Sequence, residues 1–321
     1  MTTRLTDEFH AERFTCVNAA GRRIAGLVCT PRAGEPRGHV VLPPGYQQRI
    51  HHFSVLSRYL VRHGYATVRF DFTNHIGLSE GEIVDLTMSS MAADIAAVVA
   101  TCRRLPGPQL VAATSLGARA TIRALAESPP PRPVAGVVLV LPVVDVEYTT
   151  TRVIGRNVID RWRTGEVRDE SVRDRVLDYD VSFGFARDAL ENRFDGPLQT
   201  GSELAAILAP VTAIAAERDD WIDHRDVERA MAFAAPAARH TIVMEATSHD
   251  LSHNPPVVRL LVEQILGAFA AAIGAPSEVA HLEFDEIVAT IAQERAWKRE
   301  AYTSLPEHRS LATAPLKEVA R

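Results

Sequence analysis

The chain has 321 residues, of which 46% are apolar and 23% are charged, and its formal net charge is −5. These values are typical of a globular protein that buries a sizeable core. The negative charge argues against broad nucleic-acid binding, which requires a basic surface. The polar N-terminal residues are unlike a signal peptide, and three scattered cysteines predict neither a disulfide framework nor a zinc ribbon. We therefore expect a cytoplasmic protein.

Short strand-like runs alternate with helical runs along most of the chain. Strands are predicted at residues 38–46, 66–72, 109–115, 134–144, 211–220 and 240–250, and helices at 53–65, 88–105, 116–128 and 257–274. This alternation predicts a mostly parallel sheet with helices on both faces. The longest apolar run, Val134–Val144, contains Pro142 and is too short to cross a bilayer, so no membrane span is expected.

Two regions interrupt the alternation. Residues 145–200 are polar and arginine-rich, with helical stretches and no clear strand. We interpret them as an insertion that forms a lid over one end of the sheet. Residues 276–321 are interpreted as a helical extension, which leaves residues 1–144 and 201–275 as the α/β core.

A candidate nucleophile lies where the strand at 109–115 meets the next helix. Ser115 stands at this junction, and Ala113 and Gly117 lie two positions before and after it. Small residues at these two positions are what the tight turn of a nucleophile elbow requires. A serine after a strand can also be a simple helix N-cap. The pentapeptide alone leaves both interpretations open.

Two later strand ends supply partners for this serine. Asp219 and Asp220 stand at the end of the strand predicted at 211–220, and His249 stands near the end of the strand predicted at 240–250. The order serine, acid, histidine is that of the α/β-hydrolase fold. Asp219 is the preferred acid because it lies nearer the strand and Ile222 can anchor its loop. The alternatives are a solvated turn at the two acids and a surface role for His249.

Acyl transfer through a serine also needs two backbone N–H donors, which stabilise the tetrahedral oxyanion. Leu116, directly after the serine, is predicted to supply one donor. Tyr46, in the loop LPPGYQQR (42–49) at the end of the run 38–46, is predicted to supply the other. A simple Pro-Gly turn is the alternative interpretation of this loop.

His249 and His253 stand four residues apart, as two metal ligands on one helix would. However, Asp250 occupies the position where a zinc protease has its catalytic glutamate. The prolines at 255 and 256 would also end such a helix at once. We therefore expect no metal and no organic cofactor.

Several stretches together resemble the bacterial bioluminescence acyl transferases. They are GYQQRIHHFSVLSRYL (45–60), NHIGLSEGEI (74–83), AATSLGARA (112–120), RDDWI (218–222), SHDL (248–251) and AQERAWKREAY (292–302). Members of that family are myristoyl-acyl-carrier-protein thioesterases with the α/β-hydrolase fold. The resemblance implies Ser115 as the acylated nucleophile, Asp219 as the acid and His249 as the base. The family's elbow resembles A-x-S-x-S, whereas this chain has Gly117 at the last position.

The sequence thus predicts an α/β-hydrolase that cleaves acyl thioesters, carried on an acyl carrier protein, in a setting such as fatty-acid or polyketide biosynthesis. Trp162, Phe183 and Phe185 of the insertion are predicted to line the acyl pocket. Its arginines are predicted to face an acidic carrier protein, and they are Arg152, Arg156, Arg161 and Arg163. Two alternatives stay open: a generic carboxylesterase acting on small oxygen esters, and a non-catalytic member of the fold that binds a ligand.

Overall fold

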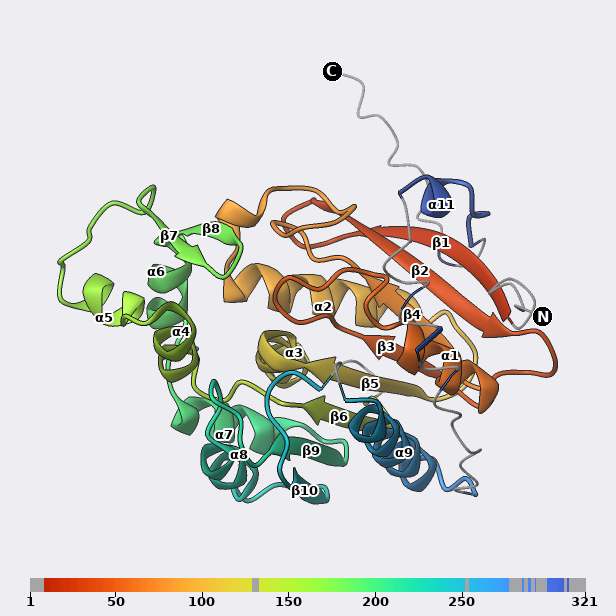
Figure 1. Cartoon of the computed structure of the whole chain (residues 1–321). Coiled ribbons are helices and arrows are strands. Elements are labelled where there is room, and N and C mark those ends of the chain that lie inside the picture. Colours follow the sequence, from red (N-terminus) through yellow and green to blue (C-terminus); the bar gives the residue numbers. More distant parts are fainter. Residues whose placement is uncertain are drawn as a thin grey trace.

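The computed structural model describes residues 9–128, 133–251, 254–276 and 299–308, together with 285, 288, 289, 292 and 311. Within this part of the chain, eight strands form one large sheet between two layers of helices (Figure 1). In spatial order the strands are β1 (Phe9–Val17), β2 (Arg23–Pro31), β4 (Ala66–Phe70), β3 (His39–Leu42), β5 (Gln109–Thr114), β6 (Gly136–Val140), β9 (Val211–Ala216) and β10 (Arg239–Met244). The predicted α/β class is confirmed.

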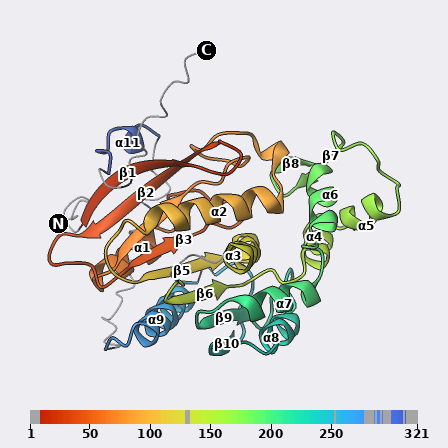
Figure 2. The ribbon, with the colours of Figure 1, turned by 180° about the vertical axis from the view of Figure 1, so that it is seen from behind.

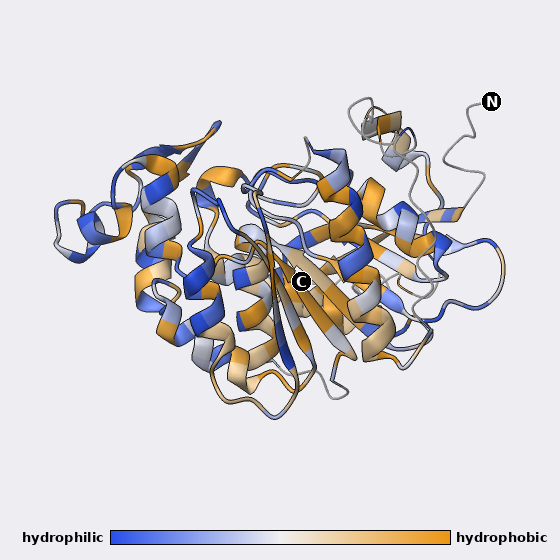
Figure 3. Ribbon diagram, turned by 60° about the horizontal axis from the view of Figure 1, so that its bottom comes forward, coloured by the Kyte–Doolittle hydropathy of each residue, from blue (hydrophilic) through white to orange (hydrophobic). Residues whose placement is uncertain are grey.

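The six strands from β4 to β10 are mutually parallel, as the sequence predicts. Strands β1 and β2 add an antiparallel edge next to β4, and the sequence analysis assigned no strand to these residues. From β4 to β9 the parallel strands are almost entirely buried and mostly apolar, because helices cover both of their faces, whereas the edge strand β10 is buried only at Met244. Figure 3 shows these hydrophobic strands at the centre of the molecule, between helices of mixed polarity.

The helices divide between the two faces of the sheet (Figures 1 and 2). Helices α1 (Ser54–Arg62) and α9 (Pro255–Ala272) cover one face, whereas α2 (Met88–Cys102), α3 (Ser115–Glu127) and α8 (His224–Met231) cover the other. The chain leaves the neighbouring strands β3 and β5 toward opposite faces, because right-handed crossovers run from them in opposite directions across the sheet. Such a switch point opens a crevice at the carboxyl ends of the two strands, where ligands bind in α/β sheets.

The segment between β6 and β9 lies beyond the carboxyl ends of the strands (Figure 1). It contains α4 (Val146–Ile154), α5 (Val158–Arg163), β7 (Arg173–Val176), β8 (Tyr179–Ser182), α6 (Gly184–Glu191) and α7 (Pro197–Ala206). Its helices agree with the predicted helical stretches. The hairpin of β7 and β8 does not, because no strand was expected between residues 145 and 200.

A buried ion cluster joins this segment to the helix that begins at Ser115. Arg119 and Arg123 of α3 contact the carboxylate of Glu203 in α7, at 2.6 and 2.7 Å. The Arg123 guanidinium also donates to the Asn192 carbonyl at 2.6 Å and lies over the Phe194 ring. Paired and hydrogen-bonded in this way, the buried charges fix α7 against α3.

The remaining described elements are the 3-10 helix η2 (Ile83–Asp85) and helix α11 (Arg299–Thr303). The Tyr302 hydroxyl of α11 contacts the carbonyl oxygens of Phe14 and Gly26 at 3.3 and 3.0 Å. Helix α11 therefore packs against β1 and β2. Most of the predicted extension, residues 276–321, lies outside the described residues.

Helix α9 is the one helix in the described ranges that is long and apolar enough to cross a membrane by length and composition alone. One third of it is buried inside the fold, and it contacts β6 and α1. An apolar face of this kind is what a helix needs to cover a sheet.

Candidate active site

Ser115 stands at the junction that the sequence predicts, directly between β5 and α3. Its φ of 51° is in the left-handed region, which a non-glycine residue occupies at a cost in free energy. The strand ends and the helix begins without an intervening loop, so the side chain projects from the carboxyl edge of the sheet. This is the geometry of a nucleophile elbow.

The small residue at position 117 has a physical cause in this structure. The carbonyl oxygen of Pro44 occupies the place where a Cβ on Gly117 would stand, so any side chain there would push α3 away from the loop after β3. Gly45 of that loop lies beside the serine, since a Cβ on it would stand 3.4 Å from the Cβ of Ser115, an ordinary contact distance. The absence of a side chain at Gly117 thus allows the loop after β3 to lie against the elbow.

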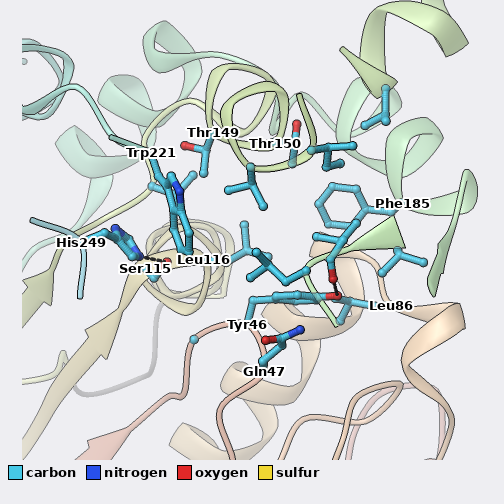
Figure 4. Close-up of a pocket in the computed structure, with 18 of the residues that line it drawn as sticks. Tyr46, Gln47, Leu86, Ser115, Leu116, Thr149, Thr150, Phe185, Trp221 and His249 are labelled. Carbon is cyan, nitrogen blue, oxygen red and sulfur yellow. Dashed lines mark hydrogen bonds between the residues drawn. The ribbon is translucent and has the colours of Figure 1, made fainter. Parts of the chain in front are cut away.

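His249 lies between Ser115 and Asp219 (Figure 4 shows it beside Ser115). Its Nε2 is 3.2 Å from the Ser115 hydroxyl, and its Nδ1 is 2.8 Å from a carboxylate oxygen of Asp219. A carboxylate only accepts, so Nδ1 carries the proton and donates it to Asp219. The lone pair of Nε2 then faces the serine hydroxyl, which is the arrangement needed to take its proton.

The loop after β9 holds Asp219 in place. One carboxylate oxygen accepts the backbone N–H groups of Trp221 and Ile222 at 2.9 and 3.1 Å, and the other faces His249. The side chain of Asp219 is only 2% exposed, whereas Asp220 is on the surface. The Trp221 ring lies 4.6 Å from the His249 ring and covers one side of it.

The two predicted oxyanion donors come from adjacent elements. Leu116 is in the first turn of α3, where backbone N–H groups have no partner within the helix. Tyr46 follows Gly45 in the loop beside the elbow. Its hydroxyl donates to the carbonyl of Val176 at 3.1 Å, which connects this loop to the β7–β8 hairpin (Figure 4).

His75 supports this loop, and the sequence analysis assigned it no role. The backbone N–H of Gln47 donates to Nε2 of His75 at 3.1 Å, so the imidazole is neutral with its proton on Nδ1. Burial lowers the pKa of His75 to about 4, which keeps the ring neutral. Gln47 itself has a φ of 61°. The one signal in the sequence was that His75 belongs to NHIGLSEGEI, a stretch that resembles the acyl transferases.

Asp71 anchors the same loop at its far end. Its carboxylate accepts the backbone N–H of Ile50 at 2.6 Å and that of Leu78 at 2.8 Å. Burial raises the pKa of Asp71 to about 6. Two polar side chains that follow β4, Asp71 and His75, therefore hold the loop from Gly45 to Ile50 in place.

A cavity of about 520 Å³ opens from Ser115 toward the segment between β6 and β9. Its walls include Phe183 and Phe185 of that segment, together with Leu86 and Val143. The lining is mostly apolar, and its polar residues include Ser115 and His249 as well as Thr149 and Thr150 of α4 (Figure 4). The size and lining are those of a site for a small organic ligand.

The placement of Trp162 differs from the prediction. Phe183 and Phe185 line the cavity, but Trp162 does not; it packs, half-buried, against the core. From the same helix, Val158 reaches the cavity. Trp162 is one helical turn further along α5, about 6 Å away at 1.5 Å per residue, which takes it past the cavity wall.

The arginines of this segment are used within the chain. Arg156 pairs with Asp174, Arg161 with Glu166 at 2.7 Å, and Arg163 with Glu147. Arg152 donates to the carbonyl of Asp220 at 2.9 Å. Three of the four predicted arginines are thus paired with acids of the same chain, and Arg152 is bound to a backbone carbonyl.

His249 lies in a loop and not on a helix, and the next helix begins at Pro255 with a proline at its first position. The paired-histidine arrangement is therefore not formed at His249, and His253 lies outside the described residues. Among those residues, there is also no group of three or more histidine, cysteine or acidic side chains placed to hold a metal ion.

Known structures show the class of protein to which this fold belongs. An esterase from Butyrivibrio proteoclasticus, solved with ferulic acid bound, superposes with a TM-score of 0.62 at 17% identity, over 79% of this chain and 98% of that one. The α/β hydrolase GrgF from a Penicillium species gives a TM-score of 0.63 at 13% identity, over 82% of this chain and 99% of that one. The fold is that of the α/β-hydrolases.

Sequence comparison gives the family within that class. Residues 18–301 match the model of the acyl transferase family. The acyl transferase of Photobacterium phosphoreum is 27% identical over 81% of this chain and 84% of its own length, and that of Vibrio campbellii is 24% identical over 84% and 87%. The chain belongs to the acyl transferase family, which confirms the resemblance seen in the motifs. It is thus an enzyme that transfers or hydrolyses acyl groups.

Proposed function

We propose that the protein cleaves acyl thioesters through an acyl-enzyme formed on Ser115, with His249 as general base and Asp219 as the group that orients it. The observation that carries this proposal is the hydrogen-bonded chain from Ser115 through His249 to Asp219, located at the mouth of an apolar cavity. A hydroxyl is a weak nucleophile until an adjacent base removes its proton.

In the proposed reaction, His249 Nε2 takes the proton of Ser115 while its oxygen attacks the thioester carbonyl. The backbone N–H groups of Leu116 and Tyr46 donate to the oxyanion that forms. The tetrahedral intermediate collapses, the C–S bond breaks, and His249 returns its proton to the departing thiol. Water or another hydroxyl compound then attacks the acyl-enzyme by the same route and releases the acyl group.

The cavity supports a long acyl group. A volume of about 520 Å³ with Phe183 and Phe185 in its walls is more than a small ester such as an acetate would fill. We therefore propose medium- or long-chain acyl thioesters as donors, including those on acyl carrier protein, where fatty-acid and polyketide chains are assembled. A generic carboxylesterase would use the same three residues on small oxygen esters.

The substrate class is tested by comparing kcat/KM for one acyl chain on coenzyme A, on acyl carrier protein and on p-nitrophenol. We expect the thioesters to react with the higher kcat/KM, and dodecanoyl to exceed acetyl in every series, because each buried methylene contributes about 0.8 kcal/mol. The Ser115→Ala variant is the background control. Higher kcat/KM for p-nitrophenyl acetate than for any long-chain thioester would assign the protein to the carboxylesterases instead.

A further inference from the structure

A second cavity, of about 460 Å³, lies on the other side of His249. It extends between the start of α1, the carboxyl ends of β5 and β6, and the N-terminal half of α9, on the face of the sheet where α1 and α9 pack together (Figure 1). From the segment between β6 and β9, only Leu141, directly after β6, contributes to its walls, and α4 to α7 do not. The proposed acyl pocket and this cavity are therefore separate spaces on either side of the proposed base.

The two cavities share a boundary of five residues. These are Gln48, Thr114, Leu141, His249 and Asp250. Leu141 is buried and has a φ of 47°, a strained conformation of the kind found at functional sites. Ser115 and Leu116 line the first cavity but not the second.

The two cavities correspond to the two reactants of the second step of the proposed reaction: the acyl chain on Ser115 and the molecule that attacks it. The acyl carbon is bonded to Ser115 and its oxygen faces the N–H of Leu116, so the acyl chain lies in the first cavity. The molecule that attacks the acyl-enzyme must instead give its proton to His249 Nε2. The second cavity reaches His249 without reaching Ser115, which places an attacking molecule on the correct side.

The walls of the second cavity indicate the chemistry of its occupant. Twelve of the eighteen lining residues are apolar, so the ligand body must be apolar too. The deepest parts of the wall come from the sheet and α9, for example Ala112, Val262 and Ile265, all of which are buried. The polar lining residues are Gln48, Thr114, His249 and Asp250, which belong to the shared boundary, and His51 and His52, which lie just before α1. A ligand that fits has one polar group directed at His249 and an aliphatic tail along α9.

We propose that this cavity binds a primary aliphatic alcohol as acyl acceptor, so that the enzyme forms an ester as well as a free acid. The inference rests on the proposed acyl-enzyme. An amine of the same length would be charged at neutral pH, and moving that charge into an apolar cavity is costly.

The proposed transfer balances without a further reactant. His249 Nε2 takes the hydroxyl proton of the alcohol as its oxygen attacks the acyl carbon. A new C–O bond forms to the alcohol, the bond from the acyl carbon to the Ser115 oxygen breaks, and His249 returns the proton to Ser115. The products are one ester and the free enzyme.

The test measures how the acyl-enzyme partitions between water and alcohols. Wild-type enzyme is supplied with a dodecanoyl thioester and an equal concentration of ethanol, butanol, hexanol or octanol, and ester and free acid are quantified by mass spectrometry. We expect the ester-to-acid ratio to rise roughly fourfold for each methylene until the cavity is full. Hexylamine should give much less amide than hexanol gives ester.

Two neighbouring residues of α9 provide a matched pair of variants. Leu261 lines the second cavity, whereas Leu260 is 44% exposed and lines neither cavity. Leu261→Trp should lower the hexyl ester-to-acid ratio at least tenfold, and Leu260→Trp should leave it unchanged. Leu261→Ala lengthens the cavity and should move the optimum toward longer alcohols, which keeps the test decisive if the tryptophan is not tolerated.

The possible outcomes separate this inference from the proposed function. Thiol release that depends on Ser115, with an ester yield equal for all alcohols or unaffected by both Leu261 variants, would overturn the acceptor site alone. Thiol release that is independent of Ser115 would overturn the proposed function itself. If Leu261→Trp changes the preferred acyl chain length and not the alcohol preference, the cavity holds the acyl chain and the inference is wrong.

Discussion

Asp219 and Asp220 are adjacent carboxylates in very different surroundings. Asp219 is buried, accepts two backbone N–H groups and faces His249, whereas Asp220 is exposed. Position within the loop therefore decides which of them can act on the histidine. The sequence favoured Asp219 for the same reason, its closeness to the strand end.

We predict that Asp219→Asn lowers kcat by up to about 10⁴ and leaves the fold intact, because an amide cannot hold the imidazole with its proton on Nδ1. Asp220→Asn is the matched control and should change kcat less than threefold. Steady-state kinetics with one acyl thioester measures both. A larger loss in Asp220→Asn than in Asp219→Asn would show that the wrong carboxylate has been assigned.

His75 supports the loop that carries Tyr46, the proposed oxyanion donor, by accepting a hydrogen bond from the N–H of the next residue, Gln47. Burial lowers the pKa of this histidine from 6.5 to about 4. Because the folded protein binds the proton more weakly than the unfolded chain, its contribution to stability is complete above pH 6.5 and is lost as the pH falls toward 4. Protonated Nε2 could no longer accept the Gln47 N–H.

We predict that His75→Ala lowers kcat about 10- to 100-fold with a smaller change in KM, since it leaves a backbone N–H without its acceptor and loosens the loop that carries Tyr46. His75→Gln keeps an acceptor at every pH and should recover part of the activity. A pH profile of kcat for the three proteins tests this role. Equal losses in both variants would indicate that His75 serves packing only.

At the scale of elements, the hairpin of β7 and β8 and helix α6 form one wall of the proposed acyl cavity. The sequence showed aromatic residues among charges here but could not orient them, because the helical period identifies a shared face without saying what that face contacts. Trp162 and Phe183 were therefore grouped together, and the structure separates them. The hairpin was missed because its strands have only four residues each and half of those residues are charged.

We predict that Phe183→Ala and Phe185→Ala shift the preferred acyl chain by two or more carbons toward longer donors, because each enlarges the cavity. Trp162→Ala is the control of similar size in the same segment, and it should leave the preference unchanged. A chain-length series of acyl thioesters gives the comparison, with circular dichroism to verify folding. If Trp162→Ala shifts the optimum as far as Phe183→Ala, the cavity has been assigned to the wrong wall.

At the scale of the whole molecule, local patterns predicted the parallel part of the sheet and the order of the three proposed catalytic residues. The strands and the three residues could both be predicted because each strand end is followed by a characteristic turn, which a few neighbouring residues identify. Strands β1 and β2 were not predicted; in β1, the adjacent Glu12 and Arg13 interrupt the alternation of apolar and polar residues. The arginine pairs join residues far apart in the chain, which a local pattern does not show.

The supports of the site are also long-range contacts. His75 and Asp71 fix the loop after β3 from the end of β4, and the buried cluster around Glu203 fixes α7 to the helix of Ser115. These contacts connect four separate parts of the chain around one serine. The proposed function therefore depends on whether acyl transfer passes through Ser115.

The most direct measurement is peptide mapping by mass spectrometry after reaction with an alkyl fluorophosphonate, with thioester cleavage followed in the same samples. We predict one label per chain, located on Ser115, and a loss of thioester cleavage that parallels labelling. Ser115→Ala should take up no label and cleave thioesters no faster than about 10⁻³ of the wild-type rate. Cleavage that continues at the wild-type rate in Ser115→Ala, or inactivation by a label on another residue, would contradict the assignment of Ser115 as the nucleophile.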